Sequence, residues 1–234
     1  MHRDRNGNIM KTFFDSMKKF RVLWAVALAF ALMALVANAS RLSREEIVYS
    51  KSLDMVLATV EGEEITLRDF AVYVAHQESA VQDQAYAYDA NNTRKYWNVR
   101  TEMGFISQVA RNEAMSMAIH DELFFKLYQE LKIELTEEEL ALIKNDADDF
   151  WSDLVDEEKD TKLGITSEDV YQTMYKIACA QKAQMVYAGI KSVDYQDMNY
   201  SEEVFLAFLE NYEYEVNDNV LGRLDFGDIT LEHK

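Results

Sequence analysis

Residues 106–131, ISQVARNEAMSMAIHDELFFKLYQEL, carry an apolar side chain at every third or fourth position over about 26 residues. This spacing places the apolar side chains on one face of an α-helix, because the helix turns once every 3.6 residues. We expect this helix to begin near Thr101 and its apolar stripe to extend roughly 39 Å at 1.5 Å per residue, which exceeds the width of a compact small domain. Other helices must therefore pack along it.

Four further helices are predicted around this long one. Three of them begin with a threonine whose hydroxyl can accept a backbone N–H, followed three residues later by an acidic residue that favours the positive end of a helix: Thr66, Thr136 and Thr166. The apolar repeats that follow, together with a shorter one near the C-terminus, predict helices over residues 66–88, 136–151, 166–188 and 201–209. Asn91-Asn92 ends the first of them, and the acidic residues 152–163 are expected to form a loop.

Two segments have the composition of β-strands. Val56–Val60 is rich in β-formers and is followed by a turn at Gly62 and a second short strand, whereas Val220–Phe226 alternates apolar and polar residues. Because an isolated strand leaves its amides and carbonyls unpaired, we expect 220–226 to join 56–60. The predicted fold class is therefore mainly α, a multi-helix domain with a long central helix and a small β pairing between its N-terminal and C-terminal strands.

Composition restricts the class of protein. The chain has 24 basic and 42 acidic residues, a formal charge of −18, which is the wrong sign for a surface that binds nucleic acid. Hydrophobic residues make up 49%, so a core can form, and zero Pro suits long helices. The single cysteine, Cys179, excludes an internal disulfide framework and a cysteine-based zinc cluster.

The N-terminus predicts export. Residues 1–21 carry six basic and two acidic side chains, and residues 22–39, VLWAVALAFALMALVANA, contain no ionisable group. The run ends in Ala37-Asn38-Ala39, the small-x-small pattern that signal peptidase cleaves. We therefore expect an extracytoplasmic protein, released by cleavage after Ala39 or anchored in the membrane by residues 22–39. Translation from Met17 instead of Met1 would give a compact leader.

The predicted organisation is a signal peptide or signal-anchor over 1–39, a linker over 40–53 and a helical domain over 54–234. From Ser40 onward the chain has 18 basic and 40 acidic residues, so the exported part carries a formal charge of −22. We interpret this charge as a solvated acidic surface that keeps the protein soluble.

The sequence contains no strong motif for catalysis or metal binding. His120-Asp121-Glu122 has the residue types of a metal site but not the helical spacing, so His120 is expected to be an ordinary helix-surface histidine. Cys179, between two alanines, is expected to be a buried thiol, and the acidic run 146–158 a solvated face. No glycine-rich phosphate loop or nucleophile elbow occurs in the sequence, so we expect no cofactor and no metal.

The order of these segments resembles the chaperone part of the SurA/PrsA family of extracytoplasmic foldases. The matching pieces lie between about residues 54 and 231. They are LATVEGEEI (57–65), IHDEL (119–123) leading into IELTEEE (133–139), and LGITSEDV (163–170). The resemblance implies a helical chaperone domain that holds unfolded or newly exported polypeptides.

Many members of that family also contain an inserted parvulin prolyl isomerase domain. Here the corresponding gap, between residue 188 and Ser201, is about a dozen residues and far too short for a parvulin fold. Isomerase activity is therefore not carried over, although a divergent isomerase remains an alternative. A second alternative is a membrane-tethered scaffold or adaptor that binds one fixed partner.

A holding function needs apolar, polarizable side chains that adapt to many segments. The candidates are aromatic and Met residues around the first interhelical connection, and the competing interpretation is that most of them belong to the core. The predicted polypeptide-binding residues are Tyr86, Tyr88, Tyr96, Trp97, Met103 and Phe105.

Overall fold

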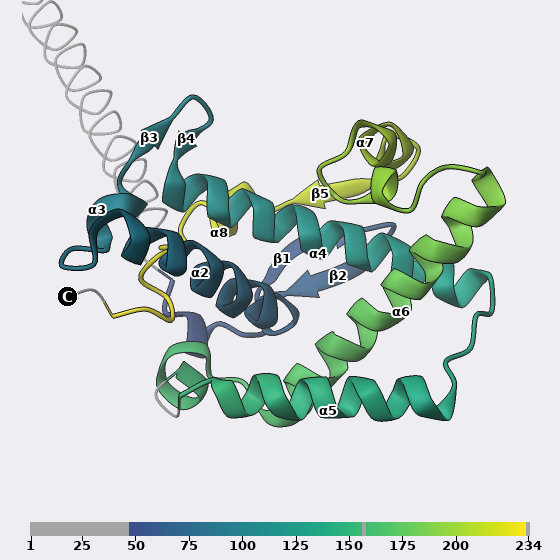
Figure 1. Cartoon of the computed structure of the whole chain (residues 1–234), viewed down its shortest axis with the longest axis horizontal. Helices are drawn as coiled ribbons and strands as arrows, with labels where there is room; N and C mark the ends of the chain where they lie inside the picture. The colour runs from purple at the N-terminus through teal and green to yellow at the C-terminus, as the bar shows by residue number, and fades with distance from the viewer. Residues whose placement is uncertain (1–46, 156–157, 233–234) are drawn as a thin grey trace, which may run out of the picture. The chain divides into compact units, whose positions relative to one another are not determined.

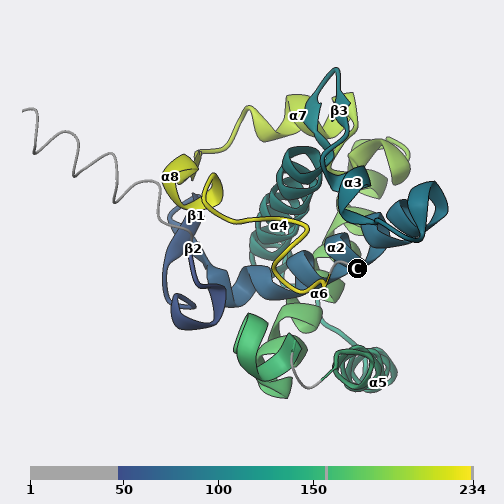
Figure 2. The same cartoon turned by 90° about the vertical axis from the view of Figure 1, so that its left-hand side faces the viewer.

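The computed structural model describes residues 47–155 and 158–232, and this part of the chain is mainly helical, as predicted (Figures 1 and 2). The α-helices are α2 (Leu67–Asp89), α3 (Arg94–Trp97), α4 (Ile106–Glu130), α5 (Glu137–Asp153), α6 (Ser167–Lys191), α7 (Glu203–Leu209) and α8 (Asp218–Leu221). The strands are β1 (Val56–Val60), β2 (Glu63–Thr66), β3 (Arg100–Thr101), β4 (Gly104–Phe105) and β5 (Tyr214–Val216). Short 3₁₀ turns η1 (Tyr49–Lys51) and η3 (Gln196–Met198) and a π-helical turn η2 (Glu158–Leu163) complete the set.

The long helix α4 is the centre of the domain, and α2 and α6 both pack against it (Figure 1). Helix α5 packs against α6, which runs back at an incline to it (Figure 1). The three predicted capping boxes are confirmed, since the side chain three residues after each threonine accepts the threonine's backbone N–H. The distances are 2.9 Å from Thr66 to Asp69, 2.7 Å from Thr136 to Glu139, and 2.8 Å from Thr166 to Asp169.

Several predicted boundaries need correction. Helix α4 begins at Ile106, not near Thr101, because residues 100–105 form the β3–β4 hairpin, in which Gly104 has a φ of +124° that no helix accommodates. Helix α7 begins at Glu203, two residues later than predicted. The segment predicted as a loop over 152–163 contains the end of α5 and the turn η2.

The predicted pairing between the two ends of the domain occurs, but with a different strand. Strand β1 lies between β2 and β5, antiparallel to both, and Thr59 is paired with Glu215. The returning strand is therefore Tyr214–Val216, and the prediction that Val220–Phe226 forms it is wrong. The Asn217 side chain accepts the Val220 N–H and starts α8, so the apolar residues that follow are buried outside the sheet.

Residues before β1 also belong to the folded domain. Ile47, Tyr49 and Leu53 are buried, and the Tyr49 hydroxyl donates to the Leu67 carbonyl over 2.6 Å. The predicted linker over 40–53 therefore needs correction for residues 47–53, because Ile47, Tyr49 and Leu53 belong to the core. The signal peptide or anchor over 1–39 and its cleavage site lie outside the described residues.

The C-terminal tail is held by one buried carboxylate. Glu78 of α2 has no exposed surface, and its Oε1 accepts N–H groups from Gly227, at 2.5 Å, and Ile229, at 3.2 Å. Its Oε2 accepts the backbone N–H of Thr230 at 2.7 Å and the hydroxyl of the same residue at 2.5 Å. Burial raises the pKa of Glu78, while these four donors favour its charged form. The tail is thus bound to α2 and not to the opening strand.

The replacement Glu78→Gln should destabilise the domain by about 2 kcal/mol, because the new amide NH₂ would face donors that have lost their acceptor. The measurement is urea unfolding followed by circular dichroism. Glu130→Gln makes the same chemical change at an exposed position of α4 and should alter the free energy of unfolding by less than about 0.5 kcal/mol. Equal unfolding midpoints for the two variants would contradict this role of Glu78.

Candidate functional site

One face of α2 is lined by three cavities that follow one another along the helix. The α2 residues at this face recur every three or four positions, which puts them in one stripe. The stripe consists of Asp69, Tyr73, His76, Ala80, Asp83 and Tyr86. Tyr73 lines both the first and the second cavity, and His76 and Phe150 line both the second and the third. We call the three cavities together the α2 groove.

The groove lies on the opposite side of α2 from the core. The core side of the helix carries Phe70, Val74, Val81 and Ala85, all buried. Tyr73 is 4% exposed, whereas His76, Ala80, Asp83 and Tyr86 are all exposed, Tyr86 by 47%. From Asp69 to Tyr86 it measures about 25 Å at 1.5 Å per residue, the length of roughly seven or eight residues of extended chain.

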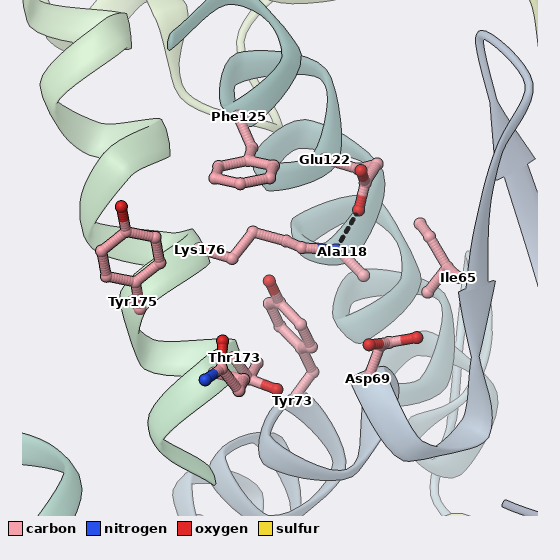
Figure 3. A pocket seen from close by; sticks show the side chains of 10 residues that line it. Ile65, Asp69, Tyr73, Ala118, Glu122, Phe125, Thr173, Tyr175 and Lys176 are labelled. Atoms are coloured by element: carbon pink, nitrogen blue, oxygen red, sulfur yellow. Dashed lines mark hydrogen bonds and ion pairs between the residues drawn. The ribbon is translucent and has the colours of Figure 1, made fainter. Parts of the chain in front are cut away.

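The first cavity, of about 270 Å³, lies among α2, α4 and α6 (Figure 3). Its main polar contact is an ion pair between Glu122 and Lys176, with 2.6 Å between Oε2 and Nζ. The Glu122 side chain is only 7% exposed, and the Lys176 ammonium also lies 5.6 Å from the centre of the Phe125 ring. These charges therefore compensate each other inside the protein.

The second cavity, of about 340 Å³, is the most apolar of the three and contains two methionines. It lies among α2, α4 and α6, with contributions from α5 and from the segment around η3. Its apolar and aromatic lining consists of Val72, Tyr73, Met117, Phe150, Met174, Ile177, Tyr195 and Tyr200.

Three polar side chains of the second cavity are bonded to one another. The Tyr73 hydroxyl donates to Asp121 Oδ2 over 3.0 Å, and Asp121 Oδ1 lies 2.8 Å from His120 Nδ1. The other ring nitrogen of His120 lies 3.0 Å from the Met198 carbonyl oxygen. Burial and the neighbouring Asp121 raise the pKa of Tyr73 well above its ordinary value. Both nitrogens of His120 are thus occupied, so this histidine is poorly placed to act as a base or ligand.

This geometry corrects the prediction for His120. Its ring is buried and lies between Phe124 and Phe205, with 4.8 Å between ring centres on each side, so it is not a helix-surface residue. Cys179 is buried as predicted, and burial raises the pKa of its thiol. Across residues 47–155 and 158–232, no group of three or more His, Cys, Asp or Glu side chains is arranged to hold a metal ion.

The third cavity, of about 540 Å³, has the largest volume of the three and the most carboxylates in its lining. One side is formed by α2 from Ala75 to Tyr86, and the other by the end of α5, with Phe150, Asp153 and Leu154. The tail residues Thr230 and Leu231, which Glu78 keeps in place, complete the wall.

The six predicted binding residues are not brought together in one place. Tyr86 lines the third cavity. Tyr88 and Tyr96 contact each other, with 5.4 Å between ring centres, and the Tyr96 hydroxyl donates to Gln84. Met103, 82% exposed, and Phe105 lie on the β3–β4 hairpin, which projects from the helices (Figures 1 and 2).

Trp97 needs a correction, because it is a core residue. It is 2% exposed, and its Nε1 donates to Gln82 Oε1 over 3.0 Å. Sequence reasoning also missed most of the groove, although the stripe from Asp69 to Asp83 has helical spacing. The sequence does not indicate that polar and small residues such as His76 and Ala80 line a cavity, because the same residue types are common on ordinary solvent-facing surfaces.

Comparison with protein-family models, with curated proteins and with solved structures found no match to this chain. The resemblance to the SurA/PrsA family therefore stays a prediction, and a function has to be derived from the groove itself. Among the helices that the structure describes, none is both long and apolar enough to cross a bilayer.

Replacing Lys176 by Met should destabilise the domain by about 2 kcal/mol, because Glu122 would stay in the first cavity without its partner. Lys144→Met breaks an exposed pair with Asp148, which solvent screens, and should leave the free energy of unfolding nearly unchanged. Urea unfolding of both variants measures the difference. In the double variant Glu122→Gln/Lys176→Met much of the loss should be recovered, and a double variant as unstable as Lys176→Met would refute the pairing.

Proposed function

We propose that this protein is an extracytoplasmic holdase that binds extended segments of unfolded or newly exported polypeptides in the α2 groove. The observation that supports the proposal is the row of three neighbouring cavities along one face of α2, which share lining residues. A groove about 25 Å long matches an extended segment better than a compact small molecule. Export follows from the predicted leader over residues 1–39.

The lining of the second cavity supports the binding of many different polypeptide segments. Met117 and Met174 have flexible, polarizable side chains that adapt their shape to different apolar groups. The aromatic rings of Tyr195 and Tyr200 add contact area at little entropic cost. Promiscuous binding surfaces commonly combine these properties.

The hydrogen bonds in the groove favour holding over chemical transformation. Tyr73, Asp121 and His120 are bonded to one another, and Glu122 is paired with Lys176. A bound segment would thus meet few polar groups that demand a fixed partner, since burying an unmatched polar group costs free energy. We accordingly assign no catalytic step to these residues.

One observation favours the alternative of a scaffold that binds a single fixed partner. The β3–β4 hairpin carries Met103, which is highly exposed, and Phe105. A projecting apolar tip of this kind could insert into a complementary pocket of a single partner protein. Capture of many unrelated exported proteins would support the holdase, whereas one stoichiometric partner lost in Met103→Gln would support the scaffold.

The variant Ala80→Trp should weaken the suppression of aggregation, because Ala80 is an exposed residue of the third cavity and an indole there would fill the groove. The measurement is light scattering of thermally unfolding citrate synthase with increasing amounts of the purified protein. Wild type should suppress the scattering, and the variant should need a higher concentration for the same effect.

Ala141→Trp is the matched control. Ala141 is exposed on α5 and lies nine residues before Phe150, which places it on the opposite face of that helix, away from the groove. It should suppress aggregation as wild type does. Failure of wild type to suppress scattering would overturn the holdase function, and equal activity of the two tryptophan variants would overturn the location of the site.

A further inference from the structure

The carboxylates Glu122 and Asp121 of the first two cavities are bonded within the protein. Glu122 forms an ion pair with Lys176 in the first cavity, and Asp121 is hydrogen-bonded to His120 and Tyr73 in the second. Asp69, at the start of the groove, accepts the backbone N–H and the hydroxyl of Thr66. A polypeptide in this part of the groove would therefore be held mainly by apolar contacts.

The third cavity differs, because it presents carboxylates from three separate elements. Asp83 comes from α2, Asp153 from α5 and Glu158 from η2, and the described lining includes neither Lys nor Arg. Asp83 and Asp153 are exposed, and within residues 47–155 and 158–232 neither forms an ion pair.

Two basic side chains lie close to this cavity without lining it. The Lys159 ammonium lies over the Trp151 ring, 4.8 Å from the ring centre, and the Lys162 ammonium donates to the carbonyl oxygen of Thr230 over 2.9 Å and lies 4.0 Å from Glu232. His76 is the one side chain of the lining that can carry a positive charge. The third cavity thus offers a bound segment negative charge beside the apolar second cavity.

We infer that the α2 groove selects polypeptide segments in which an apolar stretch is followed, about four residues away, by lysine or arginine. The inference rests on the proposed function and adds the charge and spacing of the bound segment. The apolar stretch would occupy the second cavity, near Val72 and His76, and the basic residues would lie beside Asp83 and Asp153.

The spacing follows from the geometry of α2. The middle of the stretch of α2 that lines the second cavity, between Val72 and His76, lies nine residues before Asp83, which is about 13 Å along the helix axis. An extended chain covers that distance in about four residues at 3.3 Å each. The surrounding charge is consistent with such a segment, because the chain from Ser40 onward carries 40 acidic against 18 basic residues and would steer basic polypeptides toward it.

Three fluorescein-labelled heptapeptides test the inference by fluorescence anisotropy with the purified protein. All begin with Met-Leu and a spacer of three small polar residues, which places the next residue four positions after Leu, and they end in Lys-Lys, Gln-Gln or Glu-Glu. The Lys-Lys peptide should bind about fivefold to tenfold more tightly than the Gln-Gln peptide, and the Glu-Glu peptide more weakly than either. Added salt should reduce the difference, because the charged groups are exposed.

The double variant Asp83→Asn/Asp153→Asn should remove the preference, so that the Lys-Lys and Gln-Gln peptides bind this variant with affinities within about twofold of each other. The control Glu203→Gln/Glu210→Gln removes two exposed charges from α7 and its C-cap, which line none of the three cavities, and should retain the preference. Both pairs change the net charge equally, so the comparison separates a local effect from overall attraction.

Equal affinities for the three peptides, or a preference that persists in Asp83→Asn/Asp153→Asn, would overturn the inference. In either case suppression of citrate synthase aggregation by wild type would still support the holdase function. Failure of all three peptides to bind, together with no suppression of aggregation, would overturn both.

Discussion

The structure depends on the burial of the apolar face of α4. Two helices cover it, α2 and α6, and a third, α5, packs on α6. Helix α2 uses one side, with Phe70 and Val81, for the core, and this leaves its opposite side facing α6 and the end of α5 across three cavities. The groove therefore follows from the packing of these four helices, which differ in length, around one core. The small sheet lies directly before the start of α2, and the C-terminal tail is bound to Glu78 at the middle of that helix.

The chemistry of the groove changes along its length. At the N-terminal end of α2 the charges are buried and paired, in the middle the lining is rich in Met and aromatic side chains, and at the open end carboxylates face the cavity. Such a gradient suits a ligand that is itself a chain with differing side chains along it. The groove combines adaptable apolar contacts, which allow many different polypeptides to bind, with exposed charges, which steer association and orient the bound segment.

Much of the fold could be predicted from local sequence, because local interactions specify it. The three threonine capping boxes and the apolar periods fixed the starts of α2, α5 and α6, whereas α4 was misplaced at its start because the hairpin around Gly104 interrupts the pattern. The prediction for the C-terminal strand was wrong because the alternation of apolar and polar residues over Val220–Phe226 does not come from a strand. The apolar residues of this segment are buried in the core, outside the sheet. The site was the least predictable part. Phe150 and Met174 reach α2 only through the packing of α5 and α6, and exposed aromatic residues such as Tyr88 proved to contact each other.

Site-specific photo-cross-linking tests the central claim most directly, namely that unfolded polypeptides lie in the α2 groove. A benzophenone amino acid would be placed at Ala80 or Gln181 in the groove, at Met103 on the hairpin, or at Ala141 on the far face of α5. After irradiation with unfolded citrate synthase, the account predicts covalent adducts from positions 80 and 181 and none from positions 103 and 141. Adducts from position 103 alone, or equally from all four positions, would contradict it.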